Sequence, residues 1–107
     1  MLAFLINPEN ETITAVEYTG DYKNIYTHIE ADCFDCVRIN DRGDTIFVDD
    51  NGLYKDNAFF QLKGYLQPLS GRGLVLGTDE EGESVEPQIT YEELQSQISF
   101  TEFAIAV

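Results

Sequence analysis

The apolar residues of this chain fall into short runs separated by polar turns, a pattern that favours strands over long helices. Residues 2–6 are apolar at every position, which is typical of a strand covered on both faces. A polar turn at residues 7–10 leads to a second expected strand over residues 12–18. The chain is therefore predicted to open with a β-hairpin.

A second hairpin is predicted in the middle of the chain. Residues 34–40 and 45–49 are rich in β-branched and aromatic side chains, which are the residue types that favour strands. The polar turn between them contains Gly43, which can supply the positive φ of a tight turn. Gly82 is expected to turn the chain in the same way before a short strand at residues 83–85.

Helical periodicity indicates one short helix between the two hairpins. Apolar side chains recur over residues 22–30 at the spacing of a single helix face. Asp21 stands immediately before this stretch and is the expected N-cap. His28 lies off the apolar face. The face consists of Tyr22, Ile25, Tyr26 and Ile29.

A second helix is predicted near the C-terminus, where the start signal is stronger. Thr90 and Glu93 have the spacing of a capping box, in which each side chain accepts a hydrogen bond from the backbone of the other residue. Ile89 and Leu94 occupy the two positions of a hydrophobic staple.

These elements define an α+β fold, with a small, mostly antiparallel sheet built from hairpins and two short helices packed on it. A chain of 107 residues suffices for one core, so residues 1–107 are expected to form a single domain. Apolar residues alternate at Phe103, Ile105 and Val107. The tail at residues 101–107 is therefore predicted to add an edge strand or to pair with a second subunit in a homodimer.

The chain is strongly acidic, with 20 acidic and 6 basic residues and a net charge of −14. This charge repels phosphate, so direct nucleic-acid binding is not expected, whereas a basic protein partner would be attracted. The apolar run near the N-terminus is too short for a signal peptide or a membrane span. We therefore expect a cytoplasmic protein with no membrane partner.

The two cysteines have CxxC spacing but lack the context that metal or redox chemistry requires. A zinc site needs four ligands, and the chain has no second CxxC motif. The neighbouring Asp32 and Asp35 are expected to raise a thiol pKa, whereas a redox cysteine needs a lowered pKa. We therefore interpret Cys33 and Cys36 as small buried side chains.

Nucleotide, calcium and catalytic motifs are incomplete as well. Gly71, Gly73 and Gly77 are spaced one residue too widely for a dinucleotide-binding loop, and the following residues favour a strand. Alignment of an EF-hand on either acidic glycine turn leaves apolar or amide residues at the ligand positions. We predict no catalytic residue, no metal site and no cofactor, and we expect that the protein is not an enzyme.

Residues 57–78 contain no acidic residue, in contrast to the rest of the chain. Strands are expected over residues 58–65 and 73–78, and burial would explain the missing acids because an unpaired buried carboxylate is costly. The residues expected in the core are Phe59, Phe60, Leu62, Leu66, Leu69, Leu74, Val75 and Leu76.

A second interpretation of the same stretch remains open. Its only charged residues are Lys63 and Arg72, and loop amides beside them offer a place where a small anion would be tolerated in an otherwise acidic protein. Tyr65 would stack on a nucleotide base. The hypothetical ligand-binding residues are Lys63, Tyr65, Gly71, Arg72 and Gly73.

Several segments, taken in order, resemble a known family. They are LINPENETITAVEY, the Tyr-rich helix, CVRINDRGDTIFVDDNGLY, LKGYLQPLSGRGLVLGTDEEGE and the capped helix. Their order is similar to that of domain of unknown function family 3846, small acidic proteins of tailed phages and mobile elements, and in particular to cyanophage-type members. The resemblance covers almost the whole chain. It implies a cytosolic, phage-encoded accessory protein of α+β fold, and it carries over no catalytic residues.

These features favour a non-enzymatic interaction protein that binds a host or phage protein. An acidic surface would present carboxylates in place of the phosphates of DNA and so modulate a host factor. The alternative is a binder or sponge for a small anionic ligand such as a nucleotide signal. The residues expected on the acidic surface are Asp41, Asp44, Asp49, Asp50, Asp79, Glu80, Glu81 and Glu83.

Overall fold

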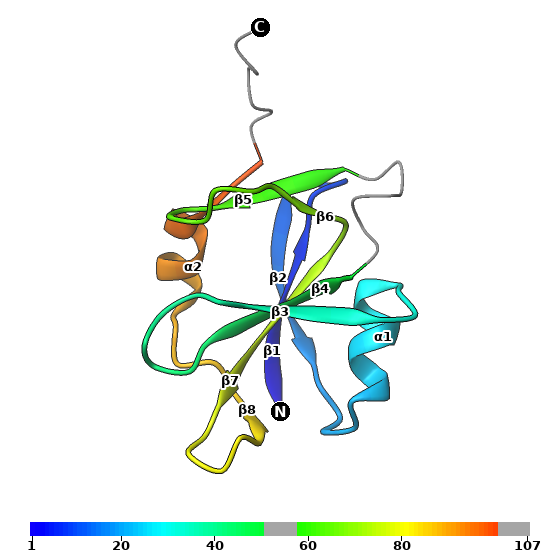
Figure 1. The fold of residues 1–107 in the computed structure, drawn as a ribbon, viewed down its shortest axis with the longest axis vertical. Helices are drawn as coiled ribbons and strands as arrows, with labels where there is room; N and C mark the ends of the chain where they lie inside the picture. The colour runs from blue at the N-terminus through cyan, green and yellow to red at the C-terminus, as the bar shows by residue number, and fades with distance from the viewer. Residues whose placement is uncertain (51–57, 101–107) are drawn as a thin grey trace, which may run out of the picture.

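The computed structural model describes residues 1–50 and 58–100, which form antiparallel strands and two short helices (Figure 1). This arrangement confirms the predicted α+β class. The elements are β1 (Leu2–Asn7), β2 (Thr12–Glu17), α1 (Lys23–Ile29), β3 (Phe34–Arg38), β4 (Thr45–Asp49), β5 (Phe59–Leu62), β6 (Leu69–Ser70), β7 (Gly73–Thr78), β8 (Ser84–Val85), α2 (Tyr91–Gln97) and β9 (Ile98–Ser99).

The main sheet is built from the two predicted hairpins and one strand that joins them. Its order is β2-β1-β7-β4-β3, and the short β8 continues the pairing from one end of β7. β7 pairs antiparallel with β1 on one side and with β4 on the other. A strand from late in the chain therefore lies between two hairpins that come earlier.

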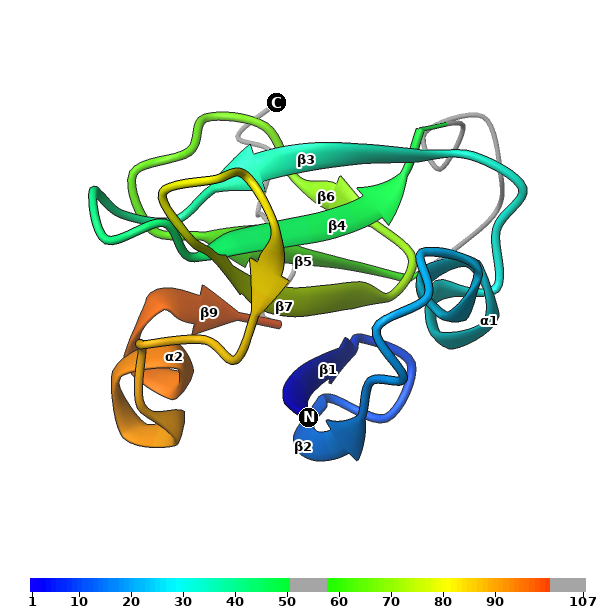
Figure 2. The ribbon, with the colours of Figure 1, turned by 90° about the horizontal axis from the view of Figure 1, so that it is seen from below.

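Each face of the main sheet is covered by different elements. A smaller sheet of order β6-β5-β9 packs on one face together with α2, while α1 packs on the other. Figure 2 shows the two helices on opposite sides of the strands. No helix among the described residues is long and apolar enough to cross a membrane.

Alternation along β7 divides the interior into two clusters, as expected for a strand buried on both faces. Val75 packs with Phe60 and Leu94 on the α2 side, and Leu74 and Leu76 pack on the α1 side. These five side chains are fully buried. Burial thus explains why β7, the longest strand in the acid-free stretch, carries no charge.

The core prediction is wrong at Leu66, whose side chain is 96% exposed. The chain turns between β5 and β6, where Gly64 has a φ of +86°, and this turn carries Leu66 away from both clusters. Phe59 is half-buried, and the other predicted core residues of the stretch are buried.

The predicted glycine turns and the predicted capping box, which depend on neighbouring residues alone, are confirmed. Gly43 and Gly82 have φ values of +95° and +83°. In α2, the Thr90 side chain accepts from the Glu93 backbone N–H, and the Glu93 side chain accepts from the Thr90 N–H, each at 3.1 Å. Both halves of the capping box are therefore present.

Asp21 is not the N-cap of α1. The cap position is taken by Tyr22, which makes no side-chain cap hydrogen bond, and α1 begins at Lys23. The Asp21 carboxylate instead accepts from the backbone N–H of Lys23, the first residue of α1, at 3.0 Å. The strand or dimer prediction for residues 101–107 lies outside the described residues.

Candidate functional site

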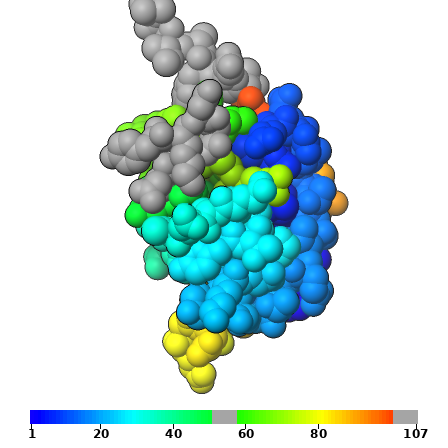
Figure 3. All heavy atoms as spheres, turned by 90° about the vertical axis from the view of Figure 1, so that its right-hand side faces the viewer, coloured from blue at the N-terminus to red at the C-terminus, as the bar shows by residue number. Residues whose placement is uncertain are grey.

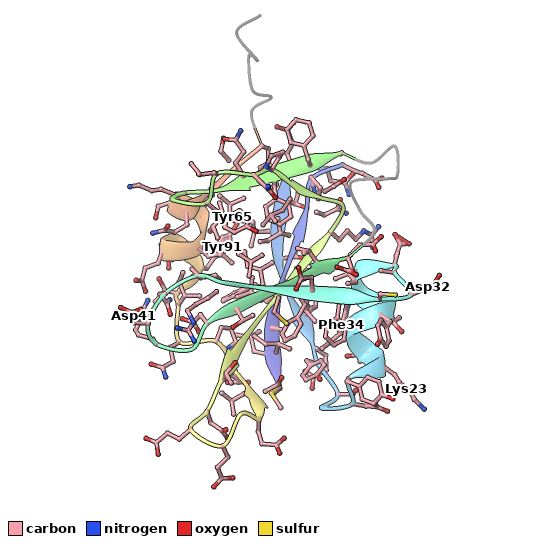
Figure 4. The ribbon with its side chains drawn as sticks, in the orientation of Figure 1. Lys23, Asp32, Phe34, Asp41, Tyr65 and Tyr91 are labelled. Atoms are coloured by element: carbon pink, nitrogen blue, oxygen red, sulfur yellow. The ribbon has the colours of Figure 1, made fainter. Side chains whose placement is uncertain are left out.

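Two acidic turns contact each other at their bases. The β3–β4 turn contains Asp41, which is exposed and labelled in Figure 4. The β7–β8 turn is its neighbour because β4 pairs with β7. A side-chain carbon built on Gly43 would lie 2.5 Å from the carbonyl oxygen of Thr78, so only glycine permits this close approach. Contact between the two turns therefore depends on Gly43.

The β7–β8 turn, residues 79–83, projects beyond the body of the molecule (Figures 1 and 3) and is named the acidic finger here. Its shape comes from its own residues. The Asp79 carboxylate accepts from the backbone N–H groups of Glu81 and Glu83, both at 2.9 Å. The side chains of Glu80, Glu81 and Glu83 extend into water.

Asp44 belongs to the interior rather than to the acidic surface. It is 0% exposed. Its carboxylate accepts hydrogen bonds from the backbone N–H groups of Gln88 at 2.7 Å and Ile89 at 3.0 Å, and from the Asn40 side-chain amide at 2.9 Å. These bonds satisfy a buried charged group and attach the β3–β4 turn to the segment that precedes α2.

The remaining predicted acids lie at the opposite end of β4. Asp49 is buried, with 8% exposure, while Asp50 is exposed. Together with Asp35 and Tyr65 they line a small hollow of about 90 Å³. The acidic residues predicted from sequence therefore divide into one cluster at the finger and Asp41, one group around this hollow, and the buried Asp44.

Two of the hypothetical ligand-binding residues share a cavity. Lys63 and Tyr65 line a shallow hollow of about 440 Å³ between the β5–β6 turn and the end of α2. Gly71, Arg72 and Gly73 are not among its lining residues. The Gly71 N–H donates to the Ala58 carbonyl at 2.8 Å, and Gly73 is buried in β7.

Arg72 points toward the end of α1 instead of toward Lys63. Its guanidinium forms an ion pair with the Glu30 carboxylate at 3.1 Å. Glu30 is the C-cap of α1 and has a φ of +56°, a left-handed conformation. The structure therefore places the two basic residues of the acid-free stretch in different surroundings.

The two cysteines are exposed, so the prediction that they are buried is wrong. The reason is that β3 is the last strand of the main sheet and has no neighbour on its outer side among the described residues. Partial desolvation and, to a smaller extent, the charge of Asp35 raise the pKa of the Cys36 thiol. No group of three or more His, Cys, Asp and Glu residues suited to a metal ion occurs in the described part of the chain.

Sequence reasoning missed a groove beside the other outermost strand, β2. The groove has a volume of about 350 Å³ and lies between the start of β2 and one face of α2. Its two walls come from segments almost eighty residues apart in sequence, and no local pattern indicates that they meet. The lining residues are Glu11, Thr12, Ile13, Thr14, Tyr91, Gln95, Ile98 and Phe100.

Comparison with known proteins gives a family but no activity. A Methanosarcina mazei protein described as "Putative ABC transporter ATP-binding protein" is 38% identical over 73 residues, a match that covers 66% of this chain and 22% of that protein. The chain thus spans about a fifth of the length of this relative. No solved structure matches. The family model for Domain of unknown function (DUF3846) matches residues 1–99, and the chain therefore belongs to this family.

Proposed function

We propose that this protein is a non-enzymatic interaction protein that binds a basic protein partner through the acidic finger and Asp41. The observation that supports this best is the projection of the finger from the body of the molecule, with its base packed against Gly43 of the neighbouring β3–β4 turn (Figure 1). The finger carboxylates of Glu80 and Glu81 are exposed and make no ion pair within the described residues, so they are free to meet a cationic surface.

The charge of this surface indicates what kind of partner it would bind. Carboxylates clustered on a protein with a net charge of −14 attract a positively charged partner and speed its approach. In a partner that normally binds DNA, these carboxylates would occupy the sites that bind DNA phosphates. An origin in a tailed phage or mobile element, a cytoplasmic location and a host nucleic-acid-binding factor as target all belong to this proposal.

Removal of charge from the finger tests the proposal. Immobilised wild-type protein and a Glu80→Gln/Glu81→Gln variant would be exposed to host lysate at low and high salt. The matched control is Glu9→Gln/Asp32→Asn, which removes the same charge from exposed sites outside the finger. We expect partners that bind wild type and control at low salt, elute at high salt or with duplex DNA, and are lost from the finger variant. Equal capture by all three proteins would contradict the proposal.

The alternative, a binder of a small anion, has weaker support. Lys63 and Tyr65 line one hollow, so a bound nucleotide could meet a cation for its phosphate and an aromatic ring for its base at the same place. A thermal-shift measurement against a panel of nucleotides, with Lys63→Gln as the control, tests it directly. A shift that the substitution abolishes would favour this alternative, and a flat response across the panel would count against it.

A further inference from the structure

The two outermost strands of the main sheet, β2 and β3, differ in how their free edges are protected. An unprotected edge strand is a template for pairing with another chain, and proteins commonly block it with charges or local hydrogen bonds. β3 is blocked in this way. The backbone N–H of Cys36 donates to the Asp35 carboxylate at 2.8 Å, and Asp35 and Arg38 place charges along the strand.

Residues 12–16 of β2 lack these devices. Residues 12–16 contain no charged residue and no proline. Within the part of the chain that the structure describes, β2 pairs with β1 alone. Among the described residues, the outer edge of residues 12–16 is therefore available to another segment.

The hydrogen-bond register identifies the backbone groups that face outward. Met1 and Tyr18 exchange two backbone bonds, from the Met1 amino group to the Tyr18 carbonyl at 2.9 Å and from the Tyr18 N–H to the Met1 carbonyl at 2.8 Å. Antiparallel pairs alternate, so Ile13, Ala15 and Glu17 direct their N–H and C=O groups away from β1. The outward Glu17 carbonyl is indeed bound by the His28 ring at 2.8 Å.

His28 thus covers one end of the β2 edge and leaves the rest open. The N–H and C=O groups of Ile13 and Ala15 remain for an added strand, which would form two bonds opposite each residue. The groove described above runs beside this open part. Its apolar lining includes Ile13, Ile98 and Phe100, so it suits the inward-facing side chains of an extended segment.

We propose that the β2 edge and this groove bind an extended, cationic segment of a partner protein, which adds to the main sheet as a further strand. The choice of occupant follows from charge. Glu11 lines the groove, no basic residue does, and a second copy of the chain would bring another −14 charge. This inference rests on the proposed function, because it gives the basic partner a second point of attachment.

Two matched pairs of variants test the edge. Ala15→Pro removes an N–H that points outward, so the β1–β2 hydrogen bonds are kept, and proline is tolerated in edge strands. Cys36→Pro makes the same change on β3, where the N–H is already occupied by Asp35. Thr14→Lys and Thr14→Glu place opposite charges on one exposed groove position. Circular dichroism would establish that each variant folds. If Ala15→Pro does not fold, the two Thr14 variants alone test whether the peptide binds at the β2 edge.

The probe is a fluorescent ten-residue peptide that alternates valine and lysine, with a valine–glutamate peptide as its control. We expect anisotropy to show binding of the lysine peptide only. Ala15→Pro and Thr14→Lys should weaken this binding at least tenfold, Thr14→Glu should strengthen it, and Cys36→Pro should leave it unchanged. Hydrogen exchange at the Ile13 and Ala15 amides should slow when the peptide binds.

Four results would overturn the inference. The first is no binding of the lysine peptide, and the second is binding that neither Ala15→Pro nor Thr14→Lys changes. Concentration-dependent dimers that Ala15→Pro abolishes would assign the edge to a second copy. The Ile13 and Ala15 amides could also be protected from hydrogen exchange without peptide and lose this protection on deletion of residues 101–107. That result would mean that the chain's own C-terminal residues occupy the β2 edge. Because the Glu80→Gln/Glu81→Gln variant keeps the β2 edge, peptide binding by that variant separates failure here from failure of the finger proposal.

Discussion

The β3–β4 turn and the acidic finger both combine aspartates with a glycine at positive φ, yet they are held in different ways. Asp44 in the first turn is buried and binds backbone groups of Gln88 and Ile89, which lie 44 and 45 residues away. Among the described residues, the Asp79 carboxylate in the finger accepts hydrogen bonds only from its own turn. The same side chain thus fastens distant segments in one turn and shapes an exposed loop in the other.

Because of this difference, we expect the β3–β4 turn to contribute to stability and the finger to contribute to partner binding. The β3–β4 turn is attached to α2 through Asp44 and through an ion pair between Arg42 and Glu93 at 3.2 Å. Both partners of that ion pair are about half exposed, so Asp44 contributes most of the attachment. Changes in the finger should alter binding while the fold persists, whereas changes around Asp44 should alter the fold first.

Asp44→Ala tests this difference most strongly. The substitution leaves the N–H groups of Gln88 and Ile89 and the Asn40 amide without their acceptor, so we expect the free energy of unfolding to fall by about 3 kcal/mol or more. Asp79→Ala, the matched change in the finger, should cost less than about 1 kcal/mol. Urea denaturation measures both. Equal losses would mean that the two turns are not held differently.

The two glycines give the next largest contrast. Alanine at either position must adopt positive φ, which costs about 1 kcal/mol. At Gly43 the added carbon also meets the Thr78 carbonyl oxygen, whereas nothing lies within 4 Å at Gly82. We expect Gly82→Ala to cost about 1 kcal/mol and Gly43→Ala to cost about 2–3 kcal/mol in the same urea experiment. A Gly43→Ala cost no greater than that of Gly82→Ala would contradict the close packing of the turns.

A pH titration tests the contribution of Glu93, which forms the exposed ion pair between the β3–β4 turn and α2. The Thr90 backbone N–H, and to a smaller extent Arg42, lower the pKa of the Glu93 carboxyl from its ordinary value of 4.5. The folded state therefore gains stability from ionised Glu93 above that value, and this gain is lost as the pH falls through the lowered pKa. Glu93→Gln should remove part of the acid-induced loss of stability below about pH 5. Glu80→Gln, with the same charge change in the finger, serves as the control, and identical acid profiles for the two variants would argue against a role of Glu93.

The smallest expected effect concerns the finger itself. Glu80→Gln/Glu81→Gln removes two exposed carboxylates that make no ion pair among the described residues, so the free energy of unfolding should change by less than about 0.5 kcal/mol. Thermal denaturation at two salt concentrations measures this. A loss above about 1 kcal/mol would show that the finger supports the fold and would weaken its separation from the β3–β4 turn.

Features that depend on neighbouring residues were predictable from sequence. Gly43 and Gly82 turn the chain as expected, and the Thr90–Glu93 capping box forms, because each is decided by three or four adjacent residues. Asp21 shows the limit of such reasoning. The start of α1 is shifted by one residue from the prediction, so Asp21 is the residue before the cap and not the cap itself.

Features that depend on distant residues were not predictable. Nothing in residues 40–44 indicates that Asp44 is buried, since its backbone partners come from the segment before α2. The exposure of Cys36 follows from the strand order, which places β3 at the edge. The β2 groove likewise exists only once α2 has packed beside β2. The candidate site therefore depends on the topology, while the acids that form it could be found in the sequence.

The position of β7 between β1 and β4 has a consequence for synthesis of the chain. The ribosome completes both hairpins before it reaches residue 73, and until then β1 and β4 each lack the neighbour with which they finally pair. Nascent chains arrested before β7 would carry two hairpins with inner edges uncovered, and exposed edges of this kind promote aggregation. Emergence of residues 73–78 from the ribosome is therefore the step that allows the two separate hairpins to form one sheet.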